Sequence, residues 1–479
     1  MSAVAALVVA AALAGCGGTT YFAGRNLPPS GLTNRVVIAI QNPSSFAKGA
    51  LQFVDAYYDT RSGYNGKPAS FSISGYSGAL PITIQNMPEE QLGAVYGSGD
   101  GSLTMISYAK ESTSGSAGTL NGLSSSVFIT RNQSYVFAAS QASHVFTVLD
   151  KTNNGSYALS LPGVYRTSVN PGGSVALAFV QNSNYVYYPL KLTAAQTTSY
   201  SGGPSTWPRA AVDCEPQNAP GYCLLQAQSP DNVDATGIHY GAPLVFDRPV
   251  KAVFSADGGT AYILNCGPEC GGSKASITPL PVAPMIFLTG QQSGTLPTNS
   301  ALSSSTIAIP GGASNALVDS STLYVVGQKP TQVQGQTLFG GNLTVVNLLN
   351  NTASSPISVS DGAPGAISRM LLADDNTLWI GMTQCTNGVR AATGQSYGCL
   401  TMVNTTNNTV TMLEPYIGDA TGIAAVTGLS KIYTAEGGQV YIYSTVDGSS
   451  IDNQYVTVTG TAYDVAYMDG LTDANNTVY

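Results

Sequence analysis

The stretch "VKAVFSADGGTAYILN" (residues 250–265) holds two largely apolar runs on either side of an Asp-Gly-Gly turn sequence. A second copy, "ISRMLLADDNTLWIGM" (residues 367–382), places Asp-Asp-Asn between two similar runs. Alternation with a period of two is typical of β-strands, and Asp, Asn and Gly supply the positive φ that tight hairpin turns require. Each stretch therefore predicts an antiparallel β-hairpin.

Looser copies of this hairpin recur along the chain. They lie at residues 92–108, 127–150, 165–192, 313–327 and 422–448. Where the connecting loops are short, neighbouring copies start about 40 to 55 residues apart, as expected of one four-stranded propeller blade per repeat. The repeat therefore predicts an all-β fold, a β-propeller of seven or eight four-stranded blades. An open array of sandwich-like sheets is the alternative architecture.

The two ends of the chain complement each other. The N-terminal stretches "RVVIAIQ" (35–41) and "ALQFVDAYYD" (50–59) supply strands without a clear first strand. The C-terminal stretch "YDVAYMDGLTDANNTVY" (463–479) begins a repeat without finishing it. We expect strands from both termini to share one blade, because this closes the ring and leaves no exposed sheet edge. The sequence therefore predicts a single propeller domain over residues 34–479.

One copy of the repeat also resembles a known family. "FSADGGTAYILN" (254–265) is similar to the repeat of YVTN-type β-propellers, Ser-Pro-Asp-Gly followed after a short gap by Tyr-Val-x-Asn, with Ala256 in place of the usual proline. "ITRNQSYVFAAS" (129–140) and "LADDNTLWIGM" (372–382) are weaker matches. The resemblance covers residues 34–479 and implies a propeller. Because some propellers similar to this family are lactonases or lyases, it leaves an enzyme open.

The N-terminus reads "MSAVAALVVAAALAGCGG" (1–18). Its apolar run of about 12 residues is too short to span a bilayer, which takes roughly 20, but it fits the core of a signal peptide. Leu-Ala-Gly-Cys resembles the bacterial lipobox, which implies removal of residues 1–15 and lipidation of Cys16. No Lys or Arg precedes Arg25, so the basic segment expected before the apolar core is missing. A plain signal peptide with an incidental cysteine is the alternative.

Export sets the expected surroundings of the mature protein. Residues 16–33 are rich in Gly, Thr and Pro and predict a flexible tether. Two or more acyl chains on Cys16 hold a protein stably on a membrane. We therefore expect a lipid-anchored protein of the bacterial cell envelope that faces the periplasm or the exterior.

The six remaining cysteines fall into three local couples. These are Cys214 with Cys223, Cys266 with Cys270, and Cys385 with Cys399. Thiols pair and stay paired in the oxidising compartments that exported proteins reach. A structural zinc site needs four converging Cys or His ligands, and the chain's two histidines, His144 and His239, lie near no couple in sequence. We predict three local disulfides, although six cysteines permit other connectivities.

Two of these couples share one kind of loop. In a propeller, the loops between the second and third strands of each blade lie on the same face as the connections between blades. Cys266 and Cys385 each follow a second strand, and "QKPTQVQGQTLFGG" (328–341) enlarges the equivalent loop between them. We call this side the loop face and expect a protein or polysaccharide ligand there, because pinned loops bind with less loss of entropy. Protection from proteolysis explains the disulfides equally well.

A long Pro-rich segment, residues 199–245, interrupts the repeat and holds the couple Cys214 and Cys223. It predicts an insertion into the propeller. Two placements are open, a cap over the ring or an irregular outer strand of the fourth blade.

Composition and motifs exclude several functions. Only 9% of residues are charged and the net charge is -8, without a concentrated Lys/Arg patch, so we expect no nucleic-acid partner. No P-loop, dinucleotide or EF-hand motif is present, and we predict no cofactor or metal. The carboxylate pairs Glu89-Glu90 and Asp374-Asp375 fall in first-to-second turns, opposite the loop face. Asp55 and Asp59 form a weak candidate for a calcium or carbohydrate contact.

The leading hypothesis is an exported, lipid-anchored propeller that binds a partner through its loop face. The main alternative is an exported enzyme, lactonase- or lyase-like, that acts at the central channel. A structural envelope module is a third.

Overall fold

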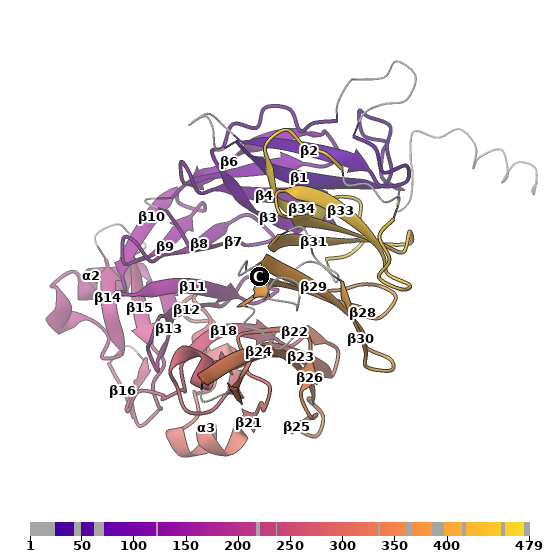
Figure 1. Cartoon of the computed structure of the whole chain (residues 1–479). Coiled ribbons are helices and arrows are strands. Elements are labelled where there is room, and N and C mark those ends of the chain that lie inside the picture. The colour runs from indigo at the N-terminus through magenta and orange to yellow at the C-terminus, as the bar shows by residue number, and fades with distance from the viewer. Residues whose placement is uncertain are drawn as a thin grey trace, which may run out of the picture.

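The computed structural model describes residues 24–42, 49–61, 71–120, 123–216, 221–235, 237–333, 336–360, 366–385, 397–413, 418–451 and 456–473. They form an eight-bladed β-propeller whose sheets are arranged around a central axis (Figure 1). The predicted fold class is confirmed, and the blade count of seven or eight resolves to eight. We number the blades from 1, the one that both termini share.

Four blades are regular four-stranded sheets whose strands follow chain order from the axis outward. Blade 2 contains β3 (Pro81–Met87), β4 (Leu92–Gly97), β5 (Ser102–Ser107) and β6 (Ser112–Thr119). Blade 3 contains β7 (Ser126–Ile129), β8 (Tyr135–Ser140), β9 (Val145–Asp150) and β10 (Gly155–Ser160). Blade 5 contains β18 (Pro249–Phe254), β19 (Thr260–Asn265), β20 (Ser276–Pro281) and β21 (Ile307–Ala308). Blade 7 contains β27 (Ala366–Leu372), β28 (Thr377–Cys385), β29 (Tyr397–Asn404) and β30 (Thr409–Leu413).

The other blades depart from this pattern. Blade 4 contains β11 (Val164–Val169), β12 (Ala176–Val180), β13 (Val186–Lys191), β15 (Tyr222–Gln226) and, outermost, β14 (Ala211–Glu215). Blade 6 contains β22 (Asn315–Asp319), β23 (Thr322–Val333) and β24 (Gln336–Asn347), which pairs with both β25 (Thr352–Ala353) and β26 (Ile357–Ser358). Blade 8 contains β31 (Ala420–Val426), β32 (Lys431–Glu436) and β33 (Gln439–Ser444).

Blade 1 closes the ring as the sequence predicts. The C-terminal strand β34 (Thr461–Tyr467) takes the innermost place and pairs antiparallel with β1 (Arg35–Gln41), which pairs with β2 (Ala50–Asp55). Figure 1 shows the yellow C-terminal strand beside the indigo N-terminal strands. Both ends of the chain thus contribute to one sheet.

A buried ion cluster joins these ends. Arg35 is fully buried and donates from Nε to Asp469 at 3.0 Å, from Nη2 to Asp469 at 2.6 Å and from Nη1 to Glu111 at 2.8 Å. Asp469 follows β34, and Glu111 belongs to blade 2. The cluster therefore binds both termini to the neighbouring blade.

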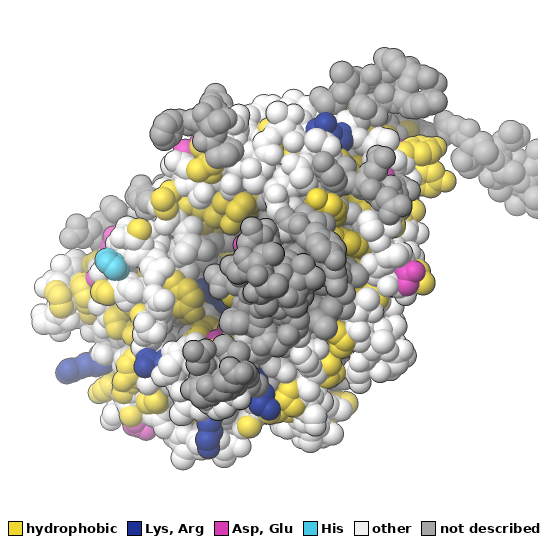
Figure 2. All heavy atoms as spheres, viewed as in Figure 1, with side chains coloured by type: hydrophobic (Ala, Val, Ile, Leu, Met, Phe, Trp, Pro, Cys, Tyr) yellow, Lys and Arg dark blue, Asp and Glu magenta, His cyan; other side chains and the backbone are white. Residues whose placement is uncertain are grey.

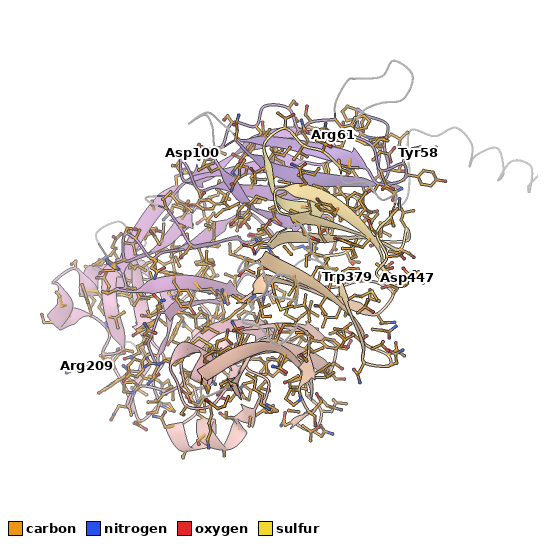
Figure 3. All side chains as sticks on the ribbon, viewed as in Figure 1. Tyr58, Arg61, Asp100, Arg209, Trp379 and Asp447 are labelled. Atoms are coloured by element: carbon orange, nitrogen blue, oxygen red, sulfur yellow. A yellow bond between two sulfur atoms is a disulfide. The ribbon has the colours of Figure 1, made fainter. Side chains whose placement is uncertain are left out.

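The apolar core consists of clusters between the facing sheets of adjacent blades. Trp379 of β28 is an example: it is fully buried, its ring centroid lies 6.2 Å from that of Tyr443 in blade 8, and its Nε1 donates to Thr377 at 3.0 Å (Figure 3). Alternation along each strand supplies such side chains to both faces of a sheet, so each blade packs against two neighbours.

The described residues of the Pro-rich segment extend blade 4 outward, with β14 as its outermost strand. The segment holds the end of α2 (Ala194–Tyr200), the β14–β15 hairpin and a small sheet of β16 (Asn232–Val233) and β17 (His239–Tyr240). Arg209 marks the outer edge of the molecule in Figure 3. The described residues also contain the helix α3 (Asn299–Ser305) and the short 3-10 turns η2 (Pro204–Thr206), η3 (Gly267–Cys270) and η4 (Ala283–Met285). Among the described residues, no helix has the length and apolar character to cross a bilayer.

Candidate ligand-binding channel

The innermost strands of all eight blades line a cavity of about 1060 Å³ along the axis of the ring. Small-molecule sites in proteins usually enclose a few hundred to about 1,000 Å³. On the face that Figure 2 shows, charged side chains are sparse and scattered among uncharged ones. We call this axial cavity the channel, and its volume is in the range of small-molecule sites.

A belt of side-chain hydrogen bonds holds the channel wall together. Each bond runs from the inner strand of one blade to that of the next, linking blades 1 to 2, 2 to 3, 3 to 4, 4 to 5, 5 to 6 and 7 to 8. The bridging side chains are Asp464, Gln85, Ser126, Ser168, Lys251 and Ser368. Gln85, for example, accepts from the Ile129 amide at 2.8 Å and donates to its carbonyl at 2.7 Å. The belt fixes the wall before any ligand binds.

Several inner strands carry a β-bulge near their N-terminal ends. A bulge adds one unpaired residue and turns the strand locally, so the residue after it takes a defined place. The register puts equivalent residues after the bulge in blades 2, 4, 5, 7 and 8. These residues are Thr83, Arg166, Lys251, Arg369 and Gly422. Three of the five are cations, at one level of the channel.

Gly422 is the one glycine among these five residues, because its position has no room for a side chain. A Cβ on Gly422 would lie 2.7 Å from Oδ1 of Asp464 in blade 1, the carboxylate that accepts from the Ile84 amide. A larger side chain would therefore displace the belt. At this junction the backbone of blade 8 packs directly against blade 1, whereas blades 4, 5 and 7 place long charged side chains at the same level.

Lys251 is the most enclosed of the three cations. Its side chain donates from Nζ to Oδ1 of Asn315 at 2.8 Å, and the residue is 8% exposed. Burial lowers the pKa of Lys251 well below its ordinary value, and the charges of Arg166 and Arg369 lower it further. Arg166 lies over the Tyr165 ring, 5.6 Å from its centroid, and Arg369 donates to the Ser368 carbonyl at 3.0 Å. The charges of the two arginines thus act on the pKa of Lys251 in the same direction as its burial.

The opposite end of the channel is a rim of first-to-second turns. Arg131 stands there and pairs with Glu89, with Glu90 at 3.4 Å and with Asp473 at 3.0 Å. Asp374 accepts from the Gly428 amide at 3.2 Å. The two carboxylate pairs noted in the sequence do lie in these turns, and Glu89 and Glu90 are both in ion pairs. At the rim one cation contacts three carboxylates, so charges of both signs meet there.

Comparison with known proteins leaves the function open. No family model matches the sequence, and no curated protein matches it. Among solved structures, the dihydro-haem d1 dehydrogenase NirN, in complex with DHE, is 11% identical, covers 95% of this chain and 78% of its own, and has a TM-score of 0.48. Hydrazine synthase of Kuenenia stuttgartiensis is 14% identical, with coverage of 72% and 90% and a TM-score of 0.45. Apo AztD of Citrobacter koseri is 10% identical, with coverage of 91% and 98% and a TM-score of 0.42. These likenesses are too distant to indicate a function.

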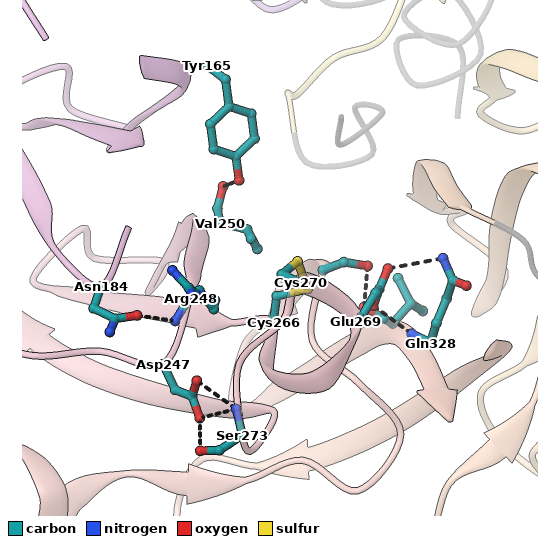
Figure 4. The surroundings of a disulfide bond; sticks show 12 residues. Tyr165, Asn184, Asp247, Arg248, Val250, Cys266, Glu269, Cys270, Ser273 and Gln328 are labelled. Atoms are coloured by element: carbon teal, nitrogen blue, oxygen red, sulfur yellow. Dashed lines mark hydrogen bonds between the residues drawn. A yellow bond between two sulfur atoms is a disulfide. The ribbon is translucent and has the colours of Figure 1, made fainter. Parts of the chain in front are cut away.

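On the loop face, the disulfide between Cys266 and Cys270 closes a short turn, as predicted (Figure 4). Glu269, inside this turn, accepts hydrogen bonds from Gln328 of blade 6, from the amide at 2.9 Å and from Nε2 at 3.1 Å. Burial raises the pKa of Glu269. Asp247 accepts from the Lys274 amide at 2.7 Å and holds the other side of the turn. The loop is therefore fastened both to its own blade and to the next.

The other predicted cysteine sites have different outcomes. Cys214 and Cys223 form the second predicted disulfide and lie opposite each other in β14 and β15, at the outer edge of blade 4. Cys399 is disulfide-bonded, but the side chain of its predicted partner Cys385 lies outside the described residues, so that pairing stays a prediction. Cys16 also lies outside the described residues, and its lipidation stays a prediction.

Asp55 and Asp59 do not form an open cation site. Asp59 pairs with Nζ of Lys431 at 2.6 Å and accepts from the Tyr433 hydroxyl, while Asp55 accepts from the Tyr57 amide at 3.0 Å. Within the described ranges, no group of three or more His, Cys, Asp or Glu side chains has the arrangement of a metal site. His144 sits in a turn with φ of 59° and accepts from the Gly163 amide at 3.3 Å.

Sequence reasoning missed the three cations of the channel, although a signal was present. In the repeat copies, a cation stands second in each of the stretches "YRTSV" (165–169), "VKAVF" (250–254) and "SRMLL" (368–372), all of which belong to first strands. A strand buried in a propeller core has no local reason to hold a charge there. An alignment of the repeat copies would have shown that three of them carry a cation at the same position.

Proposed function

We propose that the protein is an exported β-propeller of the YVTN type, anchored by a lipidated Cys16, which binds a small molecule in its central channel. The observation that carries the channel proposal is the axial cavity of about 1060 Å³, walled by the inner strands of every blade. The belt of interblade hydrogen bonds supports it, because a preformed wall loses little entropy when a ligand binds.

The distribution of acids favours binding over catalysis. Among the described residues that line the channel, the carboxylates are Asp374 and Asp473. Asp374 stands in a turn at the rim, and Asp473, which follows β34, pairs there with Arg131. Hydrolysis of a lactone or elimination by a lyase needs an acid and a base placed together at the reacting bond. We therefore place the proposed small-molecule ligand in the channel. The protein or polysaccharide ligand expected on the loop face stays a prediction.

Native mass spectrometry of the protein purified from an exporting bacterial host tests the channel. We expect a small molecule to co-purify, and Thr83→Trp, which fills the channel at the level of the cations, to abolish its retention. Thr406→Trp, the same change on the exposed β29–β30 turn, is the matched control. Circular dichroism first establishes that both variants fold. Equal retention by the Thr83 variant would refute the channel site, and chemical change of the bound molecule would favour the enzyme alternative.

The lipid anchor has its own test. We expect the mature protein to begin at Cys16 and to carry the mass of a diacylglyceryl group plus an N-acyl chain. Intact mass spectrometry of protein extracted from membranes measures this, and Cys16→Ser should release the protein from the membrane fraction. An unmodified Cys16 in the mature protein would reject the anchor and leave the channel proposal untouched.

A further inference from the structure

We propose that the protein docks onto a phospholipid bilayer with one face of the propeller, through apolar side chains that protrude from its turns. This face lies opposite the loop face and carries the turns that follow the first and third strands of the blades, and we call it the turn face. The inference rests on the lipid anchor of the proposed function and adds the orientation of the anchored protein.

The most exposed large apolar side chains of the described residues gather on the turn face. They are Leu349 (82% exposed), Val446 (78%), Tyr58 (71%) and Tyr57 (60%), and we call them the apolar tips. They follow β24, β33 and β2, each the third strand of its blade. Tyr58 and Asp447, which is next to Val446, lie on the same side of the molecule in Figure 3. Single exposed apolar residues are common on proteins, so the signal is their gathering on one face.

Contacts within the turn face hold the apolar tips in place. The amide of Thr445, beside Val446, donates at 3.0 Å to the carbonyl of Ser430 in the first-to-second turn of the same blade. The rings of Tyr57 and Tyr58 meet edge to face, with their centroids 4.8 Å apart. Side chains that already have fixed positions lose little entropy on binding, and tyrosine is typical of the interface between membrane and water.

The start of the described chain lies on the same face. Arg25 donates from Nη2 to the Pro88 carbonyl at 2.8 Å, and the Ser30 amide donates to Glu111 at 2.9 Å, both in turns of blade 2. Eight positions separate Cys16 from the first described residue, so they span at most about 29 Å. A domain of this length is about 60 Å across. A lipid on Cys16 therefore brings the bilayer to the turn face and not to the loop face.

The charges beside the apolar tips indicate an apolar contact. Asp447 directly follows Val446, and Asp319 ends β22, next to the turn that holds Leu349. Anionic lipids attract clusters of basic residues, which these positions do not offer. We therefore expect docking onto zwitterionic phosphatidylcholine, without loss at high salt.

The anchor allows a small apolar contact to suffice. A few side chains hold a free protein on a bilayer only weakly, but a tethered protein meets the surface at a high effective concentration. We therefore expect docking of the acylated protein and little vesicle binding by Cys16→Ser. Docking through the turn face leaves the loop face, with the disulfide of Cys266 and Cys270, directed away from the bilayer.

Tryptophan fluorescence of the full mature, acylated protein in phosphatidylcholine vesicles tests the proposal. Tyr58→Trp and Val446→Trp are reporters on the turn face, and Leu123→Trp, at a position 56% exposed on the loop face, is the matched control. We expect the two turn-face reporters to emit at shorter wavelength on vesicles and to lose intensity when brominated lipid replaces ordinary lipid. The control should show neither change beyond the background that the parent protein gives.

A second substitution separates docking of the whole face from a local contact of one side chain. Leu349→Asp, in another blade, should reduce the lipid quenching of the Tyr58→Trp reporter, because a carboxylate at one tip opposes entry of the whole face into the bilayer interface. Val212→Asp, the same kind of change on the exposed β14 of blade 4, is the matched control and should leave the quenching unchanged.

Four results would overturn the docking face. Turn-face reporters that lipid does not quench in acylated, vesicle-bound protein would reject it and leave the anchor and the channel untouched. Reporters shielded from aqueous iodide but not quenched by lipid would mean that a second copy or another protein covers this face. Quenching that requires anionic lipid would contradict an apolar contact. An unmodified Cys16, detected by intact mass, would reject the anchor and with it the bilayer as the partner.

Discussion

Arg35 in the closing blade and Lys251 in the channel are both buried cations, but their surroundings have opposite signs. Burial by itself lowers the pKa of Arg35, yet hydrogen bonds and charges from Asp469 and Glu111 outweigh it and raise that pKa. Burial lowers the pKa of Lys251 too, and there the neighbouring charges of Arg166 and Arg369 lower it further. The net pKa shift is therefore upward for Arg35 and downward for Lys251.

The difference separates two uses of buried charge. Removing one partner of a compensated pair leaves an isolated charge in the interior, so the pair is needed by the fold once it exists. A cation whose neighbours are also cations weakens the fold at that point, and such groups concentrate at functional sites. Stability measurements can therefore tell the two apart without knowledge of the ligand.

Loss of the closing cluster should have the largest effect. Arg35→Met leaves Asp469 and Glu111 buried without their cation, and we expect it to lower the free energy of unfolding by about 3 to 5 kcal/mol. Urea denaturation measures this change. Arg35→Lys keeps the charge but loses the forked hydrogen bonds to Asp469. Its free energy of unfolding should lie between those of the parent protein and Arg35→Met. A change below about 1 kcal/mol in Arg35→Met would show that ring closure does not depend on the cluster.

Glu436 in blade 8 extends the comparison from buried cations to a buried carboxyl group. It is fully buried, and its partners are hydroxyl groups, Thr434 at 2.6 Å and Tyr443 at 3.2 Å. Burial raises the pKa of Glu436 from 4.5 to about 7, although the two hydrogen bonds oppose this rise. Below pH 4.5 the carboxyl is neutral in both the folded and the unfolded protein. As the pH rises toward 7 only the unfolded chain loses the proton, so folding becomes less favourable.

We expect this carboxyl to remove about 3 kcal/mol of stability between about pH 4 and pH 8, from about 1.4 kcal/mol per pKa unit. Glu436→Gln lacks the titration, so the difference in unfolding free energy between parent and variant should change by that amount across the range. Urea denaturation at both pH values measures it. A difference independent of pH would mean that Glu436 is ionised in the folded protein.

The sequence predicts the fold well because its signals are local. Hairpin repeats and tight turns mark the blades, and the incomplete repeats at the two ends predict the shared blade. Short spacing identifies two disulfides, Cys214 with Cys223 and Cys266 with Cys270. The closing cluster could not be predicted in this way, because Arg35 and Asp469 lie 434 positions apart and nothing local marks either as a partner.

The channel site was missed for a different reason. Its cations occur in the quoted repeats, but their common level depends on bulges that precede Arg166, Lys251 and Arg369, and no sequence motif marks a bulge. Strand periodicity alone assigns every second residue to one face of a sheet, so one extra residue reverses the assignment. An alignment of the repeat copies shows that the three cations share a position, but their common level in the channel follows only from the strand register.

Removing the charge of Lys251 should stabilise the protein, the opposite of the result at Arg35. Its pKa is depressed in the folded protein, so the ammonium group destabilises the fold below the unfolded pKa of 10.5 and has no effect above it. We expect Lys251→Gln to raise the unfolding free energy by about 1 to 2 kcal/mol at neutral pH, with the gain disappearing near pH 10.5. A loss of stability at neutral pH would contradict the repulsive surroundings inferred for the channel.

The smallest effect should come from Arg131, an ionised side chain at the rim of the same channel. It contacts Glu89, Glu90 and Asp473, but its side chain is 41% exposed and that of Glu89 is 49% exposed. Water and salt screen such pairs, so Arg131→Gln should change the unfolding free energy by less than about 1 kcal/mol, and less still at high salt. Urea denaturation at low and high salt measures this. A loss as large as that of Arg35→Met would mean that having carboxylate partners, and not burial, decides how much a cation contributes to this fold.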